Sequence, residues 1–249
     1  MSDDSDVKTV VVTGGTGTLG RVVVELLRAR GHDVRAVGRS SPEWPVDLGT
    51  GAGLAVAVEG ADVVVHCANV RKGLVESTRR LVVAARAAGV RHLVHISIVG
   101  IEDVPMGYYR AKLAEERVVE ESGVPWTLLR ATQFHDLVAT ALGALARVPL
   151  LMIVPTARMQ PVEVREVAAR LVDLADAEPA GRVDDLGGPQ VRAVADLAAA
   201  YATARGLKRR VVSLSLPGKA FRALREGRVT TPEHADGKGT FEEFLAAGK

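Results

Sequence analysis

The 249-residue sequence contains a single cysteine, Cys67, and this scarcity excludes an internal disulfide. A lone thiol is typical of a reducing compartment, and the acidic residues 1–6 do not resemble a signal peptide, so we expect a cytoplasmic protein. Cys67 ends an apolar run, and we interpret it as an inert core residue. Because no cysteines and histidines cluster with the spacing of zinc ligands, we predict no metal site.

The sequence also lacks a large excess of either charge and a long uninterrupted apolar run. Its 32 basic and 30 acidic residues leave a net charge of +2, so we expect no nucleic-acid partner. The longest apolar region, 138–154, is broken by Arg147 and Pro149, and we predict no membrane-spanning segment. With 47% hydrophobic residues, the chain can instead bury a large core.

A glycine-rich turn is the most informative feature that is present. Residues 10–20 read VVVTGGTGTLG, in which a β-branched run meets Gly14, Gly17 and Gly20 at three-residue spacing. One apolar helical face follows, formed by Leu19, Val23, Leu26 and Leu27. Such a strand–turn–helix junction directs unpaired backbone N–H groups and the positive end of the helix at a diphosphate. The turn therefore predicts dinucleotide binding, with an ordinary glycine-rich turn as the alternative.

Strand-like and helical patterns alternate through the first half of the chain. The strand-like runs are 33–37, 61–67, 92–96 and 126–130, and the helical patterns are 52–59, 74–88 and 108–121. Most of these strands are continuously apolar, as in a parallel sheet covered on both faces. We therefore predict an α/β fold, a doubly wound parallel sheet of the Rossmann type. Only residues 40–46 separate Arg39 from Asp47, too few for a crossover helix, so the third strand should be short or irregular.

Beyond residue 131 this alternation weakens. Helical patterns at 134–146, 162–177 and 194–204 are followed by a strand-like run at 211–216. We expect residues 1–249 to form a single dinucleotide-binding domain, in which residues of about 132–249 make a smaller substrate-side region. Ligands of open α/β sheets bind outside the carboxyl ends of the strands, and this region should cover that edge.

The residues after the second strand indicate the choice of nicotinamide cofactor. An acidic residue there holds the ribose 2′-hydroxyl, whereas a basic residue accommodates a 2′-phosphate. Arg39 offers a planar cation and Ser40 or Ser41 a hydroxyl donor, which favours NADP(H); Arg39 stacked on the adenine is the alternative. Asp47 is expected either to accept a hydrogen bond from the adenine amine or to cap the helix that follows it.

Tyr108 and Lys112 are four residues apart and share one face of a predicted helix. A lysine ammonium near a phenol favours the phenolate, which makes Tyr108 a usable proton donor to a carbonyl oxygen or a base in reverse. Tyr109 has the wrong spacing from Lys112 and is interpreted as a packing residue. The alternative for the pair is an amphipathic helix whose lysine extends its ammonium to water.

Several segments together resemble a known family. TGGTGTLG, VGRS, VDL, VVVHCANV, HLVHISIVG and YYRAKLAEE closely resemble the atypical short-chain dehydrogenase/reductases, and in particular their NmrA-like, NAD(P)H-binding group. The stretches WTLLRATQFHDL, QPVEVREVA and LGGP extend the resemblance over essentially the whole chain.

The resemblance implies roles for individual residues. It assigns cofactor contacts to Gly14, Thr16, Gly17, Thr18, Leu19, Gly20, Ala68, Asn69 and Lys112. Tyr108 would be the catalytic acid or base, and Lys112 would hold the nicotinamide ribose while tuning that tyrosine. Ser97 would bind the substrate carbonyl, or be a buried serine bonded to the backbone, because Ile98 follows where many relatives have a second serine. Ala131 also departs from the family, whose members often carry a proline there.

These inferences together predict an NADP(H)-dependent oxidoreductase. It would transfer hydride between the nicotinamide and a carbonyl or conjugated double bond of a small, fairly hydrophobic substrate. One alternative is an NADP(H)-binding, redox-sensing regulator without turnover. Another is an epimerase or dehydratase that uses the nucleotide transiently. The sequence leaves the oligomeric state open, with a homodimer as one option.

Overall fold

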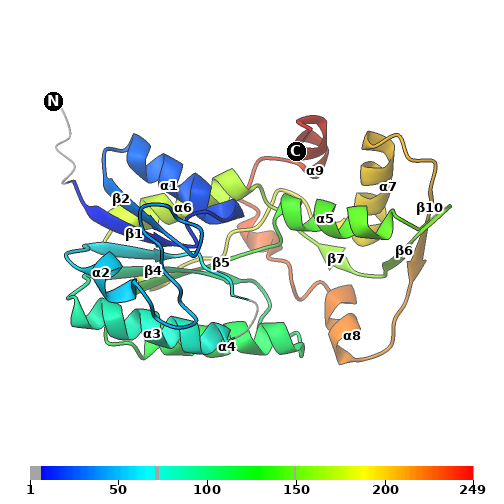
Figure 1. Cartoon of the computed structure of the whole chain (residues 1–249). Coiled ribbons are helices and arrows are strands. Elements are labelled where there is room, and N and C mark those ends of the chain that lie inside the picture. Colours follow the sequence, from blue (N-terminus) through cyan, green and yellow to red (C-terminus); the bar gives the residue numbers. More distant parts are fainter. Residues whose placement is uncertain (1–6, 71–72, 149, 249) are drawn as a thin grey trace. The chain divides into compact units, whose positions relative to one another are not determined.

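The computed structural model describes residues 7–70, 73–148 and 150–248, so the acidic start lies outside the described residues. The chain divides into two compact units, whose elements are labelled in Figure 1. The sheet unit comprises Met1–Ser97, Ala111–Leu129 and Val167–Val183, and the second unit comprises Ile98–Arg110, Arg130–Glu166 and Asp184–Lys249. Residues 132–249, expected to form the substrate-side region, are therefore divided between the two units.

A six-stranded sheet in the order β2-β1-β3-β4-β5-β8 forms the centre of the sheet unit (Figure 1). Its strands are β1 (Thr9–Thr13), β2 (Asp33–Val37), β3 (Val63–His66), β4 (His92–Ile98), β5 (Trp126–Ala131) and β8 (Gly181–Arg182). β1 pairs in parallel with both β2 and β3, so that Val10 lies opposite Val34 on one side and Val63 on the other. The predicted doubly wound parallel sheet of the Rossmann type is confirmed.

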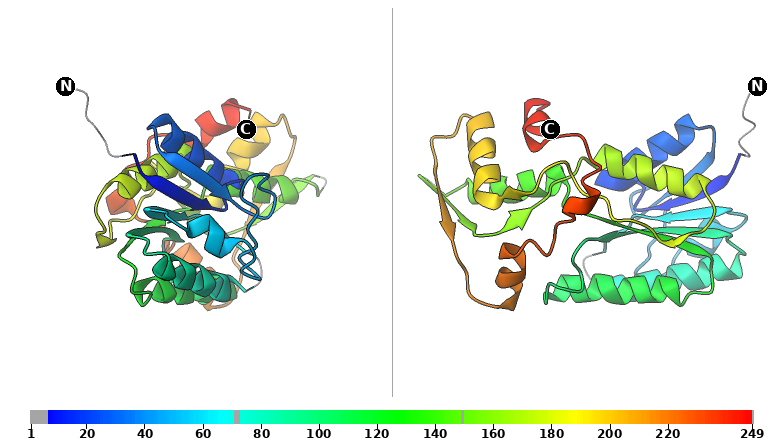
Figure 2. Two further views of the ribbon diagram at one scale, coloured as in Figure 1. Left: turned by 60° about the vertical axis from the view of Figure 1, so that its left-hand side comes forward. Right: turned by 180° about the vertical axis from the view of Figure 1, so that it is seen from behind.

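Helices cover both faces of this sheet (Figures 1 and 2). α1 (Thr18–Ala29) and α6 (Val164–Asp176) lie on one face, and α2 (Leu54–Val58), α3 (Leu74–Ala87) and α4 (Gly107–Glu120) lie on the other. Arg30, which caps α1, pairs with Asp173 and Asp176 of α6. Buried side chains of strands and helices form one core cluster under the second face, including Val64, Leu81, Leu93 and Val119.

The segment after β2 replaces the expected third strand. Gly38 and Pro45 form an isolated bridge, and Val46 N–H bonds to Gly38 O. The Ser41 hydroxyl donates to Ala36 O at 2.7 Å and accepts from Trp44 N–H at 3.3 Å, which closes the loop. The prediction that residues 40–46 leave no room for a crossover helix is confirmed.

The second unit contains two small sheets and several helices. β6 (Leu151–Pro155) pairs in parallel with β10 (Arg210–Leu214), and β7 (Arg158–Met159) pairs antiparallel with β9 (Arg192–Ala193). The helices are α5 (His135–Leu145), α7 (Val194–Ala204), α8 (Lys219–Arg225) and α9 (Phe241–Ala246), with a 3₁₀ turn at Pro232–His234. Met152, Leu197 and Phe244 belong to a shared core. Among the residues with described structure, no helix is both long and apolar enough to cross a membrane.

Candidate cofactor and catalytic site

The turn between β1 and α1 is packed so closely that its glycines cannot be replaced without strain. Gly14 has a φ of +66°, and a Cβ there would lie 2.9 Å from Ala68 Cα at the end of β3. A Cβ on Gly20 would overlap the carbonyl oxygen of Gly14 and lie 2.7 Å from its carbonyl carbon. The turn is closed by a 2.8 Å bond from Gly17 N–H to Gly14 O. This compact turn fits the close approach of a diphosphate to the backbone.

The amino-terminal end of α1 is open for an anion. Gly17 is the capping residue and provides no side-chain cap, and the first helical turn holds no acidic residue. Thr16 and Thr18 are exposed beside it. Leu19 is only 6% exposed, so its side chain packs into the core and it can offer the cofactor only its backbone N–H. Free N–H groups and the helix dipole at such an end favour a phosphate.

Arg39 and Ser40 are both exposed at the end of β2. The Ser40 hydroxyl lies 3.3 Å from Thr16 Oγ1, which brings the predicted specificity residues next to the glycine turn. Ser41 is buried and bonded to the backbone, so Ser40 is the serine whose hydroxyl faces outward. Sequence reasoning missed Arg35, whose guanidinium lies 4.9 Å from the ring centre of Trp44 and donates to Ala57 O and Glu59 O. These contacts hold the loop that carries Arg39.

Asp47 forms a local turn. Its Oδ1 accepts a 2.8 Å hydrogen bond from Gly49 N–H. The helix that follows, α2, is capped by Gly53 and not by Asp47. The interpretation of Asp47 as a helix cap is therefore wrong, because residues 48–53 separate it from the helix start. Its expected contact with the adenine stays a prediction.

The backbone just after β3 packs against the glycine turn. Ala68 N–H donates to Thr13 Oγ1 at 3.2 Å, and Asn69 beside it is exposed. Burial raises the pKa of the neighbouring Cys67 thiol to about 12. The thiol therefore stays protonated at neutral pH, in agreement with its interpretation as an inert residue.

Tyr108 and Tyr109 differ in their surroundings. Tyr108, on the first turn of α4, is 45% exposed and contacts Tyr109 edge-to-face. Tyr109 packs against the buried cluster of Val104, Ala223 and Val229, and burial raises the pKa of its phenol. The prediction that Tyr109 is a packing residue is confirmed.

Lys112 lies one turn further along α4 and is 5% exposed. Its ammonium donates to Ile96 O at 3.1 Å and to Glu115 Oε2 at 2.5 Å. The alternative of a lysine that extends its ammonium to water is therefore wrong. Its expected contact with the cofactor ribose stays a prediction.

Ser97 lies on β4 and is 2% exposed. Its hydroxyl has no hydrogen-bond partner among the residues that the structure describes. The alternative of a serine bonded to the backbone is therefore wrong. Its expected hydrogen bond to the substrate carbonyl stays a prediction.

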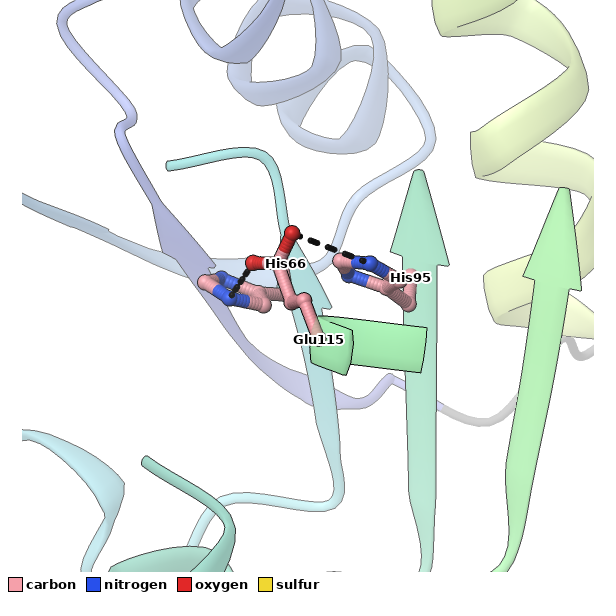
Figure 3. Close-up of side chains that lie close together, drawn as sticks. All are labelled: His66, His95 and Glu115. Atoms are coloured by element: carbon pink, nitrogen blue, oxygen red, sulfur yellow. Dashed lines mark ion pairs between the residues drawn. The ribbon is translucent and has the colours of Figure 1, made fainter. Parts of the chain in front are cut away.

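A buried polar cluster around Glu115 was not predicted from the sequence (Figure 3). Glu115 comes from α4 and lies between His66 of β3 and His95 of β4, with its Oε1 3.2 Å from His66 Nε2 and its Oε2 3.7 Å from His95 Nε2. The Thr78 hydroxyl also donates to Oε1, at 2.8 Å. The available signals were histidines inside two otherwise apolar strands and an acid three residues after Lys112.

The same three side chains could in principle ligate a metal ion, because their donor atoms lie within 4.8 Å of one another. However, the Lys112 ammonium lies 2.5 Å from the Glu115 carboxylate. A bound cation would have to share this carboxylate with the ammonium inside a buried cluster, which is costly. The sequence-based expectation of no metal site therefore stays our interpretation.

We expect Glu115 to make the stability of the protein depend on pH. Burial alone would raise the pKa of this carboxyl, but the hydrogen bond from His66 and the charge of the Lys112 ammonium hold it below its ordinary value of 4.5. Such a group stabilises the fold above its unfolded pKa, and this contribution is lost as the pH falls through the folded pKa. In denaturant titrations, the free energy of unfolding should fall below pH 4.5 in the wild type, and less steeply in Glu115→Gln. Equal slopes would contradict this assignment.

Comparisons with known proteins identify the class. Residues 14–178 match the NAD(P)H-binding family, and the chain belongs to it. A (4-alkanoyl-5-oxo-2,5-dihydrofuran-3-yl)methyl phosphate reductase of Streptomyces griseus is 36% identical over 138 residues, or 50% of this chain and 48% of the relative. An NAD(P)H azoreductase of Xenophilus azovorans is 27% identical over 223 residues, or 83% of this chain and 77% of the relative.

Solved structures share the fold. An NADPH-dependent quinone oxidoreductase of Escherichia coli, in complex with NADPH, superimposes with a TM-score of 0.76 at 19% identity, covering 96% of this chain and 99% of the other. The triphenylmethane reductase of Citrobacter sp., in complex with NADP(H), gives a TM-score of 0.69 at 20% identity, with 96% and 99% covered. The chain spans about half the length of the Streptomyces relative, as its 48% coverage shows.

Proposed function

We propose that the protein is an NADP(H)-dependent oxidoreductase that reduces a small, fairly hydrophobic acceptor. The observation that carries this proposal is the pair of Tyr108 and Lys112 on consecutive turns of α4, in a chain that also has the glycine turn of a dinucleotide site. A protein that only binds the nucleotide needs the turn but has no use for a tyrosine–lysine pair. The reductase names of the Streptomyces and Xenophilus relatives support the same class of reaction.

In this proposal the sheet unit binds the cofactor. Backbone N–H groups of Thr18, Leu19 and Gly20, at the start of α1, hold the pyrophosphate, and Arg39 with Ser40 holds the 2′-phosphate. Asp47 accepts from the adenine amine, and Ala68 with Asn69 borders the ribose and nicotinamide. Arg39, Ser40 and Asn69 are exposed and follow the carboxyl ends of β2 and β3, where ligands of such sheets bind.

The chemistry requires one proton donor and a polarised acceptor. When bound, NADPH supplies the hydride. Tyr108 donates a proton to the acceptor atom that gains negative charge, and the Ser97 hydroxyl donates a hydrogen bond to the same atom. Lys112 holds the ribose hydroxyls and favours the phenolate of Tyr108 after proton transfer.

NADPH consumption tests the proposal. The purified protein is mixed with NADPH and either 1,4-benzoquinone or an azo dye, and the absorbance of NADPH and of the acceptor is followed. We expect one NADPH to be consumed per benzoquinone reduced to hydroquinone, and one per azo dye reduced to the hydrazo compound or two per dye cleaved to amines. If NADPH binds but is consumed with neither acceptor, the regulator is favoured. Conversion of a substrate without net consumption of NADPH favours the epimerase or dehydratase.

Arg39→Ala tests the choice of cofactor. Losing a charge-assisted phosphate contact costs about 1.5–3 kcal/mol, so NADPH should bind about 10- to 150-fold more weakly to this variant. NADH, which lacks the 2′-phosphate, should bind almost as it does to the wild type. Calorimetry with both nucleotides measures the difference, and the exposed Arg79 of α3, changed to alanine, is the matched control. Equal weakening for NADPH and NADH would contradict the 2′-phosphate assignment.

A further inference from the structure

We propose that Glu115 is a positioning residue that keeps the Lys112 ammonium charged and fixed for the cofactor, through a buried network that also supports the glycine turn. This inference rests on the proposed function, because it assigns a role at the same cofactor site. Glu115 itself is completely buried and would touch neither cofactor nor substrate.

The first step is the ion pair. Lys112 and Glu115 are both buried, and the ammonium lies 2.5 Å from Oε2. A buried ammonium is stable only with a counter-charge and hydrogen-bond acceptors, which here are the carboxylate and Ile96 O. Because the second acceptor is a backbone oxygen of β4, the ammonium is held at one place on the sheet.

The second step is the link from Glu115 to the cofactor turn. His66 contacts Glu115 Oε1 through Nε2 and lies 2.7 Å from Thr13 Oγ1 through Nδ1. Thr13 immediately precedes Gly14, and its hydroxyl accepts a hydrogen bond from Ala68 N–H. Ala68 in turn packs against Gly14. A continuous chain of polar contacts therefore joins α4, β3 and β1. Networks of this kind fix the positions of the groups that they connect when their members are satisfied.

The third step concerns charge. The titratable groups that face Glu115 are His66 of β3, His95 of β4 and Lys112 of its own helix, with Cys67 following His66. Burial and the Lys112 charge hold the pKa of His95 well below its usual range, and the Cys67 thiol stays protonated. At neutral pH His95 and Cys67 therefore carry no charge, and the Glu115 carboxylate balances the ammonium.

Two substitutions of Glu115 separate this role from simple packing. Glu115→Gln keeps the size but removes the charge and turns one acceptor oxygen into an N–H₂ donor, whereas Glu115→Asp keeps the charge and both acceptor oxygens and shortens the side chain. NADP⁺ affinity is measured by calorimetry on the full chain, and thermal unfolding confirms that each variant folds. Glu120→Gln, an exposed change on the same helix, is the matched control.

We expect Glu115→Gln to bind NADP⁺ at least about tenfold more weakly at pH 8, in line with the loss of a charged contact, and Glu115→Asp to bind more tightly than Glu115→Gln. If Glu115→Gln binds NADP⁺ more tightly than Glu115→Asp, Glu115 has only a packing role and the proposal is overturned.

If Glu115→Gln does not fold, a third variant tests the proposal. Lys112→Met/Glu115→Gln removes both charges and should fold, because removing a whole buried pair is far less costly than removing one partner. It should bind NADP⁺ as weakly as Lys112→Met alone, and wild-type affinity in the double variant would overturn the proposal. Stoichiometric zinc in the wild type that is lost in His95→Ala would also overturn it, because the cluster would then be a metal site.

The outcome for the proposed function is separate. A wild type that binds NADP⁺ but consumes no NADPH contradicts the oxidoreductase and leaves the role of Glu115 in cofactor binding to be decided by the rank of the two variants. A wild type that binds neither NADP⁺ nor NAD⁺ contradicts both.

Discussion

Tyr108→Phe is expected to lower kcat by about 10²- to 10⁴-fold, the usual contribution of a positioned proton donor. The substitution removes only the hydroxyl and keeps the ring, and Tyr108 is 45% exposed, so folding should not depend on that hydroxyl. NADPH affinity should stay close to that of the wild type, because the cofactor contacts are assigned to other residues. Steady-state turnover with benzoquinone and calorimetry with NADPH measure the two quantities.

Tyr109→Phe is the matched control for this experiment. Tyr109 is adjacent in sequence and packs against Val104, Ala223 and Val229, so losing its hydroxyl should leave turnover nearly unchanged. If Tyr108→Phe turns over as fast as the wild type, the proton comes from another donor and the role assigned to Tyr108 is wrong. A larger loss in Tyr109→Phe than in Tyr108→Phe would move the assignment to Tyr109.

Gly20→Ala is expected to weaken NADPH binding by about 100-fold or more, which corresponds to about 2.7 kcal/mol. The added Cβ would overlap the carbonyl oxygen of Gly14 and lie 2.7 Å from its carbonyl carbon, and both atoms are backbone. The turn must therefore move, and the N–H groups at the start of α1 would no longer converge on the pyrophosphate. NADPH calorimetry measures the affinity, and denaturant titration measures the accompanying loss of stability.

Gly107→Ala is the control for the glycine substitution. A Cβ at Gly107 would meet no atom within 4 Å, and its φ lies outside the left-handed region. This variant should be as stable as the wild type or slightly more so, and should bind NADPH equally well. Unchanged NADPH affinity in Gly20→Ala would mean that the turn does not hold the diphosphate.

Much of the fold was predictable because its signals are local. The continuously apolar runs that became β1 and β3 are buried on both faces of the sheet, and the apolar face of α1 packs where its periodicity predicted. β6 was not predicted, since its residues 151–155 lie in an apolar region that also contains helix α5. Its pairing with β10 joins segments more than fifty residues apart, and sequence periodicity carries no information about such a contact.

The site was predictable where a motif has a fixed local geometry and not where the fold brings distant residues together. The glycine turn has the close packing that its spacing predicted. The Glu115 cluster depends on the register of β3 and β4, which pairs His66 with His95, and on the face of α4 packed over them. The helix predicted at 52–59 is α2 at Leu54–Val58, and the interpretation of Asp47 as its cap failed because residues 48–53 form a turn between them.

A structure of the protein with NADP⁺ bound tests the central claim most directly. The quantity to measure is the distance from the Tyr108 hydroxyl to C4 of the nicotinamide. We expect about 3–5 Å, with Lys112 on the ribose hydroxyls and space for a substrate over the ring, as hydride transfer with proton donation requires. A Tyr108 hydroxyl turned away from the nicotinamide, or a ring face covered by protein, would contradict the oxidoreductase and favour a nucleotide-binding regulator.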